Sequence, residues 1–334
     1  MVDAKGAGAG LWAAAHLGTP MALRVAATLR VADHIAAGTG TAPELAKACG
    51  ADADALDRLL RYLAVRGYFS REDDGRYGLT PLGEPLRDDH PDGMRAQLDL
   101  ETALGRAELA FVQLLHSVRT GEAGYPLQFG RSFWEDLVAD PARKSSFDSS
   151  MSALVPARSP AVIGGYDWAS LGTLVDVGGG DGSLLIALLR AYPQLRGTVV
   201  DQPMTARAAR QALEEAGLDD RGDAVPGDFF EPLPAGAGGY VLSWILHNWN
   251  DDAACRILRR CAEAAGAHGR VLVIEKTGPD GRSPHTGMDL RMLTFIGGKE
   301  RGLAELDGLA GEAGLRVVAV HPAGVLSITE LAAA

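Results

Sequence analysis

The stretch LVDVGGGDGSLLIALL, residues 174–189, decides the fold of this chain. Its first four residues are apolar except for Asp176, which predicts a buried strand, and its leucines fall on one face of a following helix. The glycines between them let the backbone pass close to a ligand, and the free amides at the start of the helix favour polar or anionic groups. Strand, glycine-rich turn and helix together are typical of a nucleotide-binding site.

The same pattern continues on both sides of this stretch. Further strands are predicted at TVVD (198–201), YVLSWIL (240–246) and RVLVIE (270–275), with helices between them that end near Ala216 and Ala265. Strands that alternate with helices predict a parallel sheet covered on both faces. We therefore expect an α/β, Rossmann-like domain over residues 98–334, which includes a mostly helical linker before the first strand.

The first 97 residues carry a different pattern. Thr41 and Glu44 fit a capping box, and leucines from 56 to 63 mark one face of the next helix. Asp74-Gly75 between two short apolar runs predicts a hairpin. Helices followed by a hairpin are typical of a winged helix. Residues 1–90 contain 10 basic and 12 acidic residues, too few positive charges for a DNA-binding face, so we expect a packing or dimerisation domain over residues 1–97.

Composition excludes several classes of protein. The 334 residues suffice for two domains, and the net charge of -11 repels nucleic acid and anionic membranes. No run approaches the roughly 18 apolar residues of a membrane-spanning helix, and no leader pattern is visible, which predicts a cytoplasmic protein. The 3 cysteines include no CxxC pair, and the 8 histidines show no HxxxH or HExxH spacing. We expect neither disulfides nor a metal site.

The spacing of the glycines narrows the choice of ligand. A dinucleotide fingerprint needs Gly or Ala at position 183, where this chain has Ser183. The series Asp176, Gly178, Gly180 and Gly182 instead resembles motif I of class I S-adenosylmethionine-dependent methyltransferases. That resemblance disfavours NAD and favours S-adenosylmethionine.

Two further strand ends carry candidate ligand-binding residues. Asp201 follows the strand after the glycine turn, where a carboxylate can accept hydrogen bonds from both ribose hydroxyls. Its alternative role is a cap for the next helix. Asp228 and Phe229 follow the third strand, where they can bind an adenine amino group and cover the ring. The alternative is an ordinary loop with a buried Phe.

His247 is the candidate base. It comes at the end of the predicted strand 240–246, at the sheet edge where open α/β folds bind ligands, beside Gly178 and Asp201. An imidazole titrates near neutrality and suits the removal of a phenol proton, although a structural loop histidine is the alternative. Glu275 ends the next strand, where it either orients His247 or forms a strand-end salt bridge.

Several motifs along the chain resemble one family jointly. They are FWEDL (133–137), GDFFEPLP (227–234), LHNWNDD (246–252), VIEK (273–276) and GGKER (297–301). With the winged-helix start, they are similar to small-molecule O-methyltransferases of the plant caffeate and flavonoid type and to the bacterial relatives that tailor aromatic natural products.

The resemblance implies roles for individual residues. It implies that S-adenosylmethionine binds to the glycine turn, Asp201, Asp228 and Phe229, with Ser243 near the donor. It implies that His247 is the base, flanked by Glu275 and Glu300. It also implies an intertwined homodimer formed through the first domain.

One residue of this chain departs from the pattern of the family, and the role of one helix face stays open. Many members carry Asp after the catalytic His, whereas this chain has Asn248, so that the charge at this position is absent. Met288, Met292 and Phe295 fall on one helix face at i, i+4 and i+7. They are either core residues or the wall of the substrate pocket, and the resemblance favours the pocket wall.

The resulting hypothesis is a metal-independent O-methyltransferase that acts on a phenolic hydroxyl of a small aromatic or polyketide-type substrate, in antibiotic or other natural-product biosynthesis. The alternative within the same fold is a relative that uses the bound donor in hydroxylation or decarboxylation without methyl transfer. A ligand-sensing, DNA-binding regulator is the alternative outside enzymes, and it lacks the basic face that such a role requires.

Overall fold

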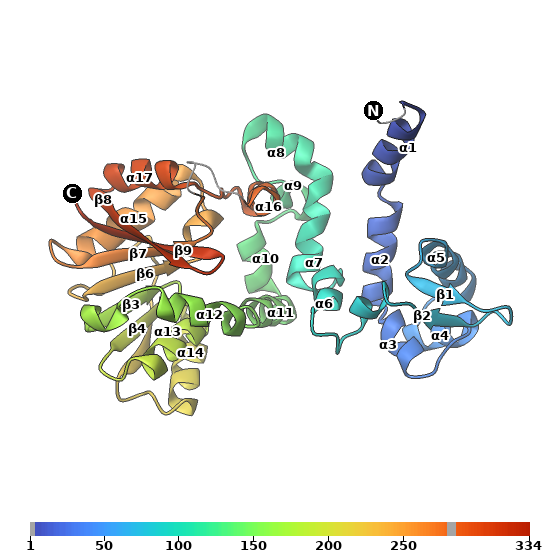
Figure 1. Ribbon diagram of the computed structural model, residues 1–334, viewed down its shortest axis with the longest axis horizontal. Helices are drawn as coiled ribbons and strands as arrows, with labels where there is room; N and C mark the ends of the chain where they lie inside the picture. The colour runs from blue at the N-terminus through green and yellow to red at the C-terminus, as the bar shows by residue number, and fades with distance from the viewer. Residues whose placement is uncertain (1–3, 279–284) are drawn as a thin grey trace. The chain divides into compact units, whose positions relative to one another are not determined.

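The computed structural model describes residues 4–278 and 285–334. The chain forms two compact units, Met1–Leu109 and Ala110–Ala334 (Figure 1). The boundary lies later in the chain than the position after residue 97 that the sequence suggests. The reason is that the segment up to residue 109 packs back onto the first unit, where Arg24 forms an ion pair of 2.9 Å with Glu108.

The first unit is a set of helices followed by a hairpin, in the order that the sequence predicts. Glu44 accepts a hydrogen bond from the Thr41 amide, and Gly75 turns the hairpin with φ +85°. The core is formed by side chains such as Leu45, Leu60 and Leu63. The elements are α1 (Ala4–Ala15), α2 (Gly18–Thr28), α3 (Val31–Ala36), α4 (Ala42–Cys49), α5 (Ala53–Val65), β1 (Phe69–Arg71), β2 (Tyr77–Leu79), η1 (Glu84–Leu86), α6 (Met94–Leu98) and α7 (Ala103–Glu108).

The second unit begins with a helical segment that leads to the sheet. It contains η2 (Leu109–Gln113), which starts at the boundary, α8 (Leu114–Thr120), α9 (Tyr125–Phe129), α10 (Phe133–Ala139), α11 (Pro141–Ser152), α12 (Val155–Gly164) and η3 (Trp168–Leu171). A capping box starts α10, because Ser132 and Glu135 exchange hydrogen bonds.

A seven-stranded sheet follows, in the order β5-β4-β3-β6-β7-β9-β8. The strands β3 (Thr173–Val177), β4 (Arg196–Asp201), β5 (Gly222–Pro226), β6 (Gly239–Ser243) and β7 (Arg270–Glu275) are parallel, whereas β8 (Leu315–Ala323) and β9 (Leu326–Ala333) add an antiparallel pair. The Rossmann-like α/β prediction is confirmed, and the antiparallel pair is the part that the strand and helix alternation does not reveal.

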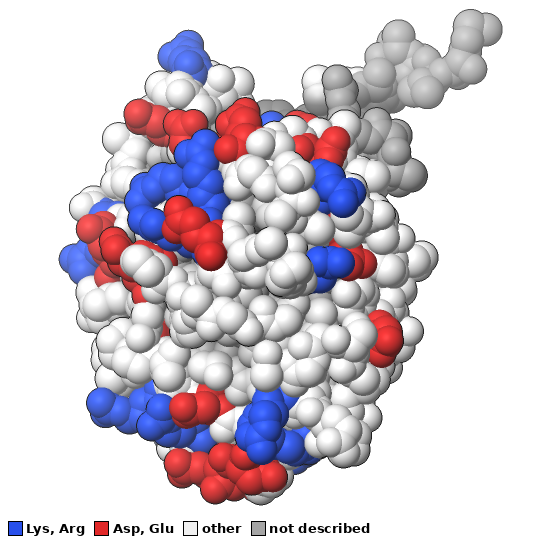
Figure 2. Space-filling view, turned by 90° about the vertical axis from the view of Figure 1, so that its left-hand side faces the viewer, with Lys and Arg blue, Asp and Glu red and all other residues white. Residues whose placement is uncertain are grey.

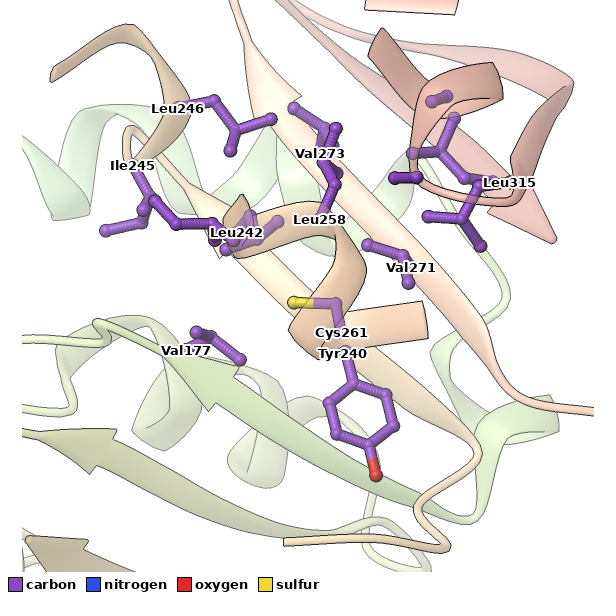
Figure 3. Packing of buried hydrophobic residues seen from close by; sticks show 14 of the residues in the cluster. Val177, Tyr240, Leu242, Ile245, Leu246, Leu258, Cys261, Val271, Val273 and Leu315 are labelled. Atoms are coloured by element: carbon purple, nitrogen blue, oxygen red, sulfur yellow. The ribbon is translucent and has the colours of Figure 1, made fainter. Parts of the chain in front are cut away.

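Two separate hydrophobic cores cover the two faces of the sheet. Side chains alternate along β6, so that Tyr240 and Leu242 pack with α15 (Asp251–Ala265) and α17 (Leu303–Glu312), while Val241 packs with α13 (Ser183–Ala191) and α14 (Pro203–Glu215). Figure 3 shows the first of these cores, in which Cys261 lies beside Tyr240. Since both faces are buried at the centre of the sheet, the strands β3, β6 and β7 are almost wholly apolar.

One strand is shorter than its sequence pattern predicts. β6 ends at Ser243, and Trp244 then adopts φ +57°, in the left-handed region. This conformation breaks the extended strand, and a single turn, η4 (Leu246–Asn248), follows. His247 therefore lies in a turn just beyond the strand rather than at its last position.

The surface and the helices give two further facts. Figure 2 shows acidic and basic side chains intermixed on the face it displays, with wide uncharged areas between them. None of the helices within residues 4–278 and 285–334 is long and apolar enough to cross a membrane.

Candidate active site

The parallel strands bring the sequence-predicted residues to one edge of the sheet. Gly178 follows β3, Asp201 ends β4, Ser243 ends β6 and Glu275 ends β7. All four strands run in the same direction, so their carboxyl ends lie along a single edge. This edge is where the chemistry of the chain is concentrated.

The glycine-rich turn forms the first part of the site. Gly178, Gly180 and Gly182 all have positive φ, between +62° and +78°. A Cβ atom on Gly178 would lie 2.6 Å from Ile245 Cδ1, whereas one on Gly180 would meet nothing within 4 Å. The turn therefore packs tightly on its inner side and leaves space above Gly180, which fits the close approach of a ligand.

Asp201 holds this turn in place. Its Oδ2 accepts a hydrogen bond from the Gly180 amide at 2.9 Å, and its Oδ1 accepts one from the Gln202 amide at 2.7 Å. Each carboxylate oxygen has capacity for a further hydrogen bond. The alternative of a simple helix cap is thus incomplete, because the side chain joins the glycine turn to the end of β4.

Asp176 lies beneath the same turn and is buried. Its Oδ2 has no hydrogen-bond partner among the described residues. Burial, followed by the charges of Asp201 and Asp181, raises the pKa of Asp176 to about 7. A buried acceptor without a partner, next to a turn with open space above it, fits a bound ligand that carries hydroxyl and amino groups, such as S-adenosylmethionine.

The raised pKa of Asp176 predicts how stability depends on pH in the ligand-free protein. Between the ordinary pKa of 3.8 and about 7, the unfolded chain releases this proton first and the folded chain keeps it. The free energy of unfolding therefore falls as pH rises through that window, by on the order of 4 kcal/mol from this group. Asp176→Asn should remove that part of the decline.

Chemical denaturation at pH 5 and at pH 8 would test this expectation. Asp219→Asn is the matched control, because Asp219 is exposed. An unchanged pH dependence in Asp176→Asn would contradict the expected result.

Phe229 contacts the glycine turn, while Asp228 faces solvent. Phe229 Cε1 lies 3.4 Å from the position of a Cβ on Gly178, and its ring packs against Trp249 with centroids 5.9 Å apart. Asp228 is exposed and accepts a hydrogen bond from the Phe230 amide. Ser243 is half-buried. Of these three predicted residues, Phe229 is the one that contacts the glycine turn.

His247 forms the second part of the site, with Glu300 as its ring partner. The buried imidazole has its Nδ1 2.7 Å from Glu300 Oε1. Since a carboxylate accepts hydrogen bonds, this contact assigns the proton to Nδ1 and leaves Nε2 with a lone pair. The arrangement prepares Nε2 to accept a proton and lets Glu300 stabilise the resulting positive charge.

Glu275 contacts the backbone of His247 rather than its ring. Its Oε1 accepts a hydrogen bond of 3.0 Å from the His247 amide, and burial raises the pKa of this carboxyl. The sequence suggests that Glu275 either orients the imidazole or forms a strand-end salt bridge. The geometry instead makes it an anchor for the main chain of the turn.

Asn248, which stands where many family members carry Asp, makes a hydrogen bond within the turn. Its Nδ2 donates to the Trp244 carbonyl at 3.0 Å. The side chain closes the turn η4 on itself, and it contributes geometry to His247 rather than charge.

Two residues of the GGKER motif support this turn, and neither was a candidate from the sequence. A Cβ on Gly298 would lie 2.3 Å from the His247 carbonyl oxygen, so that only glycine allows this approach. Arg301 is buried and donates to the carbonyls of Leu246 and Trp249, both at 2.8 Å, and to Asp251. The run of three charged residues directly after Gly297 and Gly298 is the sequence signal that could have identified Gly298 and Arg301.

The predicted pocket residues lie on α16 (Thr286–Ile296), which packs against η4. Met292 and Phe295 are buried, Met288 is half-buried, and the Phe295 ring packs edge-on against Phe111. Their role as a pocket wall stays a prediction. Among the described residues, no group of three or more His, Cys, Asp or Glu side chains is arranged to hold a metal ion.

Comparison with known proteins gives matches over the whole chain. A family profile described as an O-methyltransferase domain matches residues 111–316, and one described as an O-methyltransferase dimerisation domain matches residues 13–87. The chain is 57% identical to 2,7-dihydroxy-5-methyl-1-naphthoate 7-O-methyltransferase from Streptomyces carzinostaticus, over 97% of both chains. It is 44% identical to aclacinomycin 10-hydroxylase from Streptomyces purpurascens, over 92% of this chain and 84% of that protein.

A solved structure agrees with these matches. The O-methyltransferase of neocarzinostatin biosynthesis, crystallised with S-adenosylmethionine and 2-hydroxy-5-methyl naphthoic acid, superposes with a TM-score of 0.93 at 57% identity. The alignment covers 97% of this chain and 98% of that one.

Proposed function

Because this chain belongs to the family of S-adenosylmethionine-dependent O-methyltransferases, we propose that His247 deprotonates a phenolic hydroxyl of a small aromatic acceptor, which then receives the methyl group. The observation that carries this proposal is the buried pair of His247 Nδ1 and Glu300 Oε1, 2.7 Å apart. Its relatives act in the biosynthesis of antibiotics such as mitomycin, and we place this chain in natural-product biosynthesis as well.

The residues around the glycine turn fit the donor. Gly178, Gly180 and Asp201 would hold the ribose and the methionine moiety of the donor. Asp228 and Phe229 would hold its adenine, with Ser243 beside them. When bound, S-adenosylmethionine supplies a methyl group on a positively charged sulfur, which needs no further activation. The protein is left with positioning the acceptor and removing one proton.

The proton moves to His247 Nε2. A free phenol has a pKa of about 10 and an imidazole has one of about 6.5, so the proton transfer is unfavourable before the reaction begins. It becomes favourable as the bond between the oxygen and the methyl carbon forms, because the hydroxyl group then becomes more acidic. Glu300 stabilises the imidazolium through Nδ1, and Glu275 and Asn248 keep the turn in the conformation that presents Nε2. Glu275 and Glu300 are therefore positioning residues for the base.

Asp201 offers a test of the donor site. Asp201→Ala removes the acceptor for the Gly180 amide and for the proposed ribose hydrogen bonds, so we expect the KM for S-adenosylmethionine to rise by roughly 10-fold to 100-fold. The kcat at saturating donor should change little. Initial-rate kinetics would measure both, with the exposed Asp219→Ala as a control. An unchanged KM would remove Asp201 from the donor site.

The reaction itself is tested by mass spectrometry. Purified protein is incubated with S-adenosylmethionine and a panel of phenols, catechols and hydroxylated aromatic acids. A gain of one methylene in an acceptor supports methyl transfer. A gain of one oxygen, or a loss of carbon dioxide, would favour the alternative of hydroxylation or decarboxylation. The 44% identity with a 10-hydroxylase is the reason to test for this alternative.

We also propose that the active form is a homodimer. Residues 13–87 match the dimerisation domain of the family. In the first unit, Leu11 and Trp12 of α1 are 72% and 70% exposed. Large apolar side chains that are exposed next to one another mark a surface for association.

A further inference from the structure

Arg158 is a positively charged residue without an anionic partner near the base. It lies on α12 and is half-buried. Its guanidinium carbon is 4.5 Å from the centroid of the Trp244 ring. No ion pair or hydrogen bond links the Arg158 side chain to any residue in the described part of the chain. Burial also lowers the pKa of this side chain, which reflects the loss of water around the charge.

Trp244 joins this cation to the base. The ring centroids of Trp244 and His247 are 5.1 Å apart, with the planes inclined at 64°. Trp244 has φ +57°, in the left-handed region that a non-glycine residue rarely adopts. Its amide donates to the Ile274 carbonyl and its own carbonyl accepts from Asn248. These bonds fix the backbone of Trp244, and its indole ring packs against both Arg158 and His247.

The neighbouring acidic groups are already engaged. Glu300 Oε1 bonds the His247 ring, and Glu275 Oε1 bonds the His247 amide. An aromatic ring offsets only part of the desolvation of a guanidinium. A planar, forked cation in this position is suited to a carboxylate, which it can bind through two parallel hydrogen bonds.

Two carboxylates are candidates for this cation, that of the methionine part of the donor and one carried by the acceptor. Arg158 stacks on the Trp244 ring, and the same ring packs against His247. His285 Nδ1 lies 3.9 Å from Glu300 Oε2, the carboxylate that also contacts the His247 ring. Trp244 thus places Arg158 on the side where the acceptor meets the base.

We propose that Arg158 binds a carboxylate on the acceptor and that the substrates of this enzyme are hydroxylated aromatic carboxylic acids. The proposal rests on the function proposed above, because the base defines where the acceptor lies. Arg158 is then a specificity residue, which selects the acid over neutral phenols of the same shape.

The experiment compares a matched pair of acceptors, a dihydroxynaphthoic acid and its methyl ester. Arg158→Gln should raise the KM for the acid by about 10-fold to 100-fold, while the KM for S-adenosylmethionine and the kcat/KM for the ester stay unchanged. Arg158→Lys should restore part of the preference for the acid. Arg207→Gln, at an exposed position of α14, is the control for the loss of a positive charge.

Direct binding separates the failure of this proposal from the failure of the proposed function. Calorimetry with the S-adenosylhomocysteine-loaded enzyme should show binding of the acid to the wild type and much weaker binding to Arg158→Gln, whether or not turnover occurs. A rise in the KM for S-adenosylmethionine alone would assign Arg158 to the donor's carboxylate and overturn the proposal. Equal losses for acid and ester, no loss for either, or no binding of the acid to the wild type would also overturn it. Binding of the acid without any methylation would instead contradict the proposed function.

Discussion

His247→Ala should lower kcat by about 100-fold or more and leave the affinity for S-adenosylmethionine unchanged. The imidazole is the group whose Nε2 is left with a lone pair by the contact between Nδ1 and Glu300. Without it, the acceptor hydroxyl keeps its proton at neutral pH, because its pKa is about 10. The proposed donor site is formed by the glycine turn and Asp201, neither of which the substitution changes.

Steady-state kinetics and calorimetric titration with the donor would measure the two quantities separately. His268→Ala is the matched control, since His268 is exposed beyond the end of α15. A kcat within about threefold of the wild type would mean that proximity alone carries the reaction. Because different phenolic acceptors ionise at different pH values, the wild type and the variant should be compared with one acceptor at one pH.

Arg301→Met should destabilise the protein and impair catalysis together. The guanidinium donates to the Leu246 and Trp249 carbonyls and to Asp251, and the residue is 3% exposed. Its loss removes the charge-assisted hydrogen bonds to both carbonyls, of which the Leu246 carbonyl keeps a bond from the Trp249 amide. We expect a cost of roughly 3 kcal/mol in the free energy of unfolding. The turn that carries His247 also loses its support, so we expect kcat to fall by about 10-fold or more.

Urea denaturation would measure the stability. Separate values of kcat and of the KM for S-adenosylmethionine would show whether catalysis or donor binding is affected. A displaced base lowers kcat, whereas the KM for S-adenosylmethionine should change little. Arg316→Met, at an exposed position of β8, serves as the control for the substitution itself. Full activity in a folded Arg301→Met protein would show that the turn holds His247 without this clamp.

The fold could be predicted to the extent that it depends on local patterns. The strand, glycine turn and helix at residues 174–189, and the apolar strands that follow, correctly predict the parallel sheet. The antiparallel strands β8 and β9 were not expected, because alternation of strand and helix stops before them. The end of β6 was placed too late because the left-handed conformation of Trp244 leaves no mark on an apolar run of residues.

By itself, the sequence determined that the glycine turn, Asp201 and His247 would share one edge of the sheet. The reason is topological, because parallel strands have their carboxyl ends on the same side. Only the tertiary structure decided which carboxylate meets the imidazole. Glu300, 53 residues after His247, contacts the ring, while Glu275 contacts the backbone. That choice depends on Gly298 passing against the His247 carbonyl and on Arg301 binding the turn, which are long-range packing contacts that no local spacing encodes.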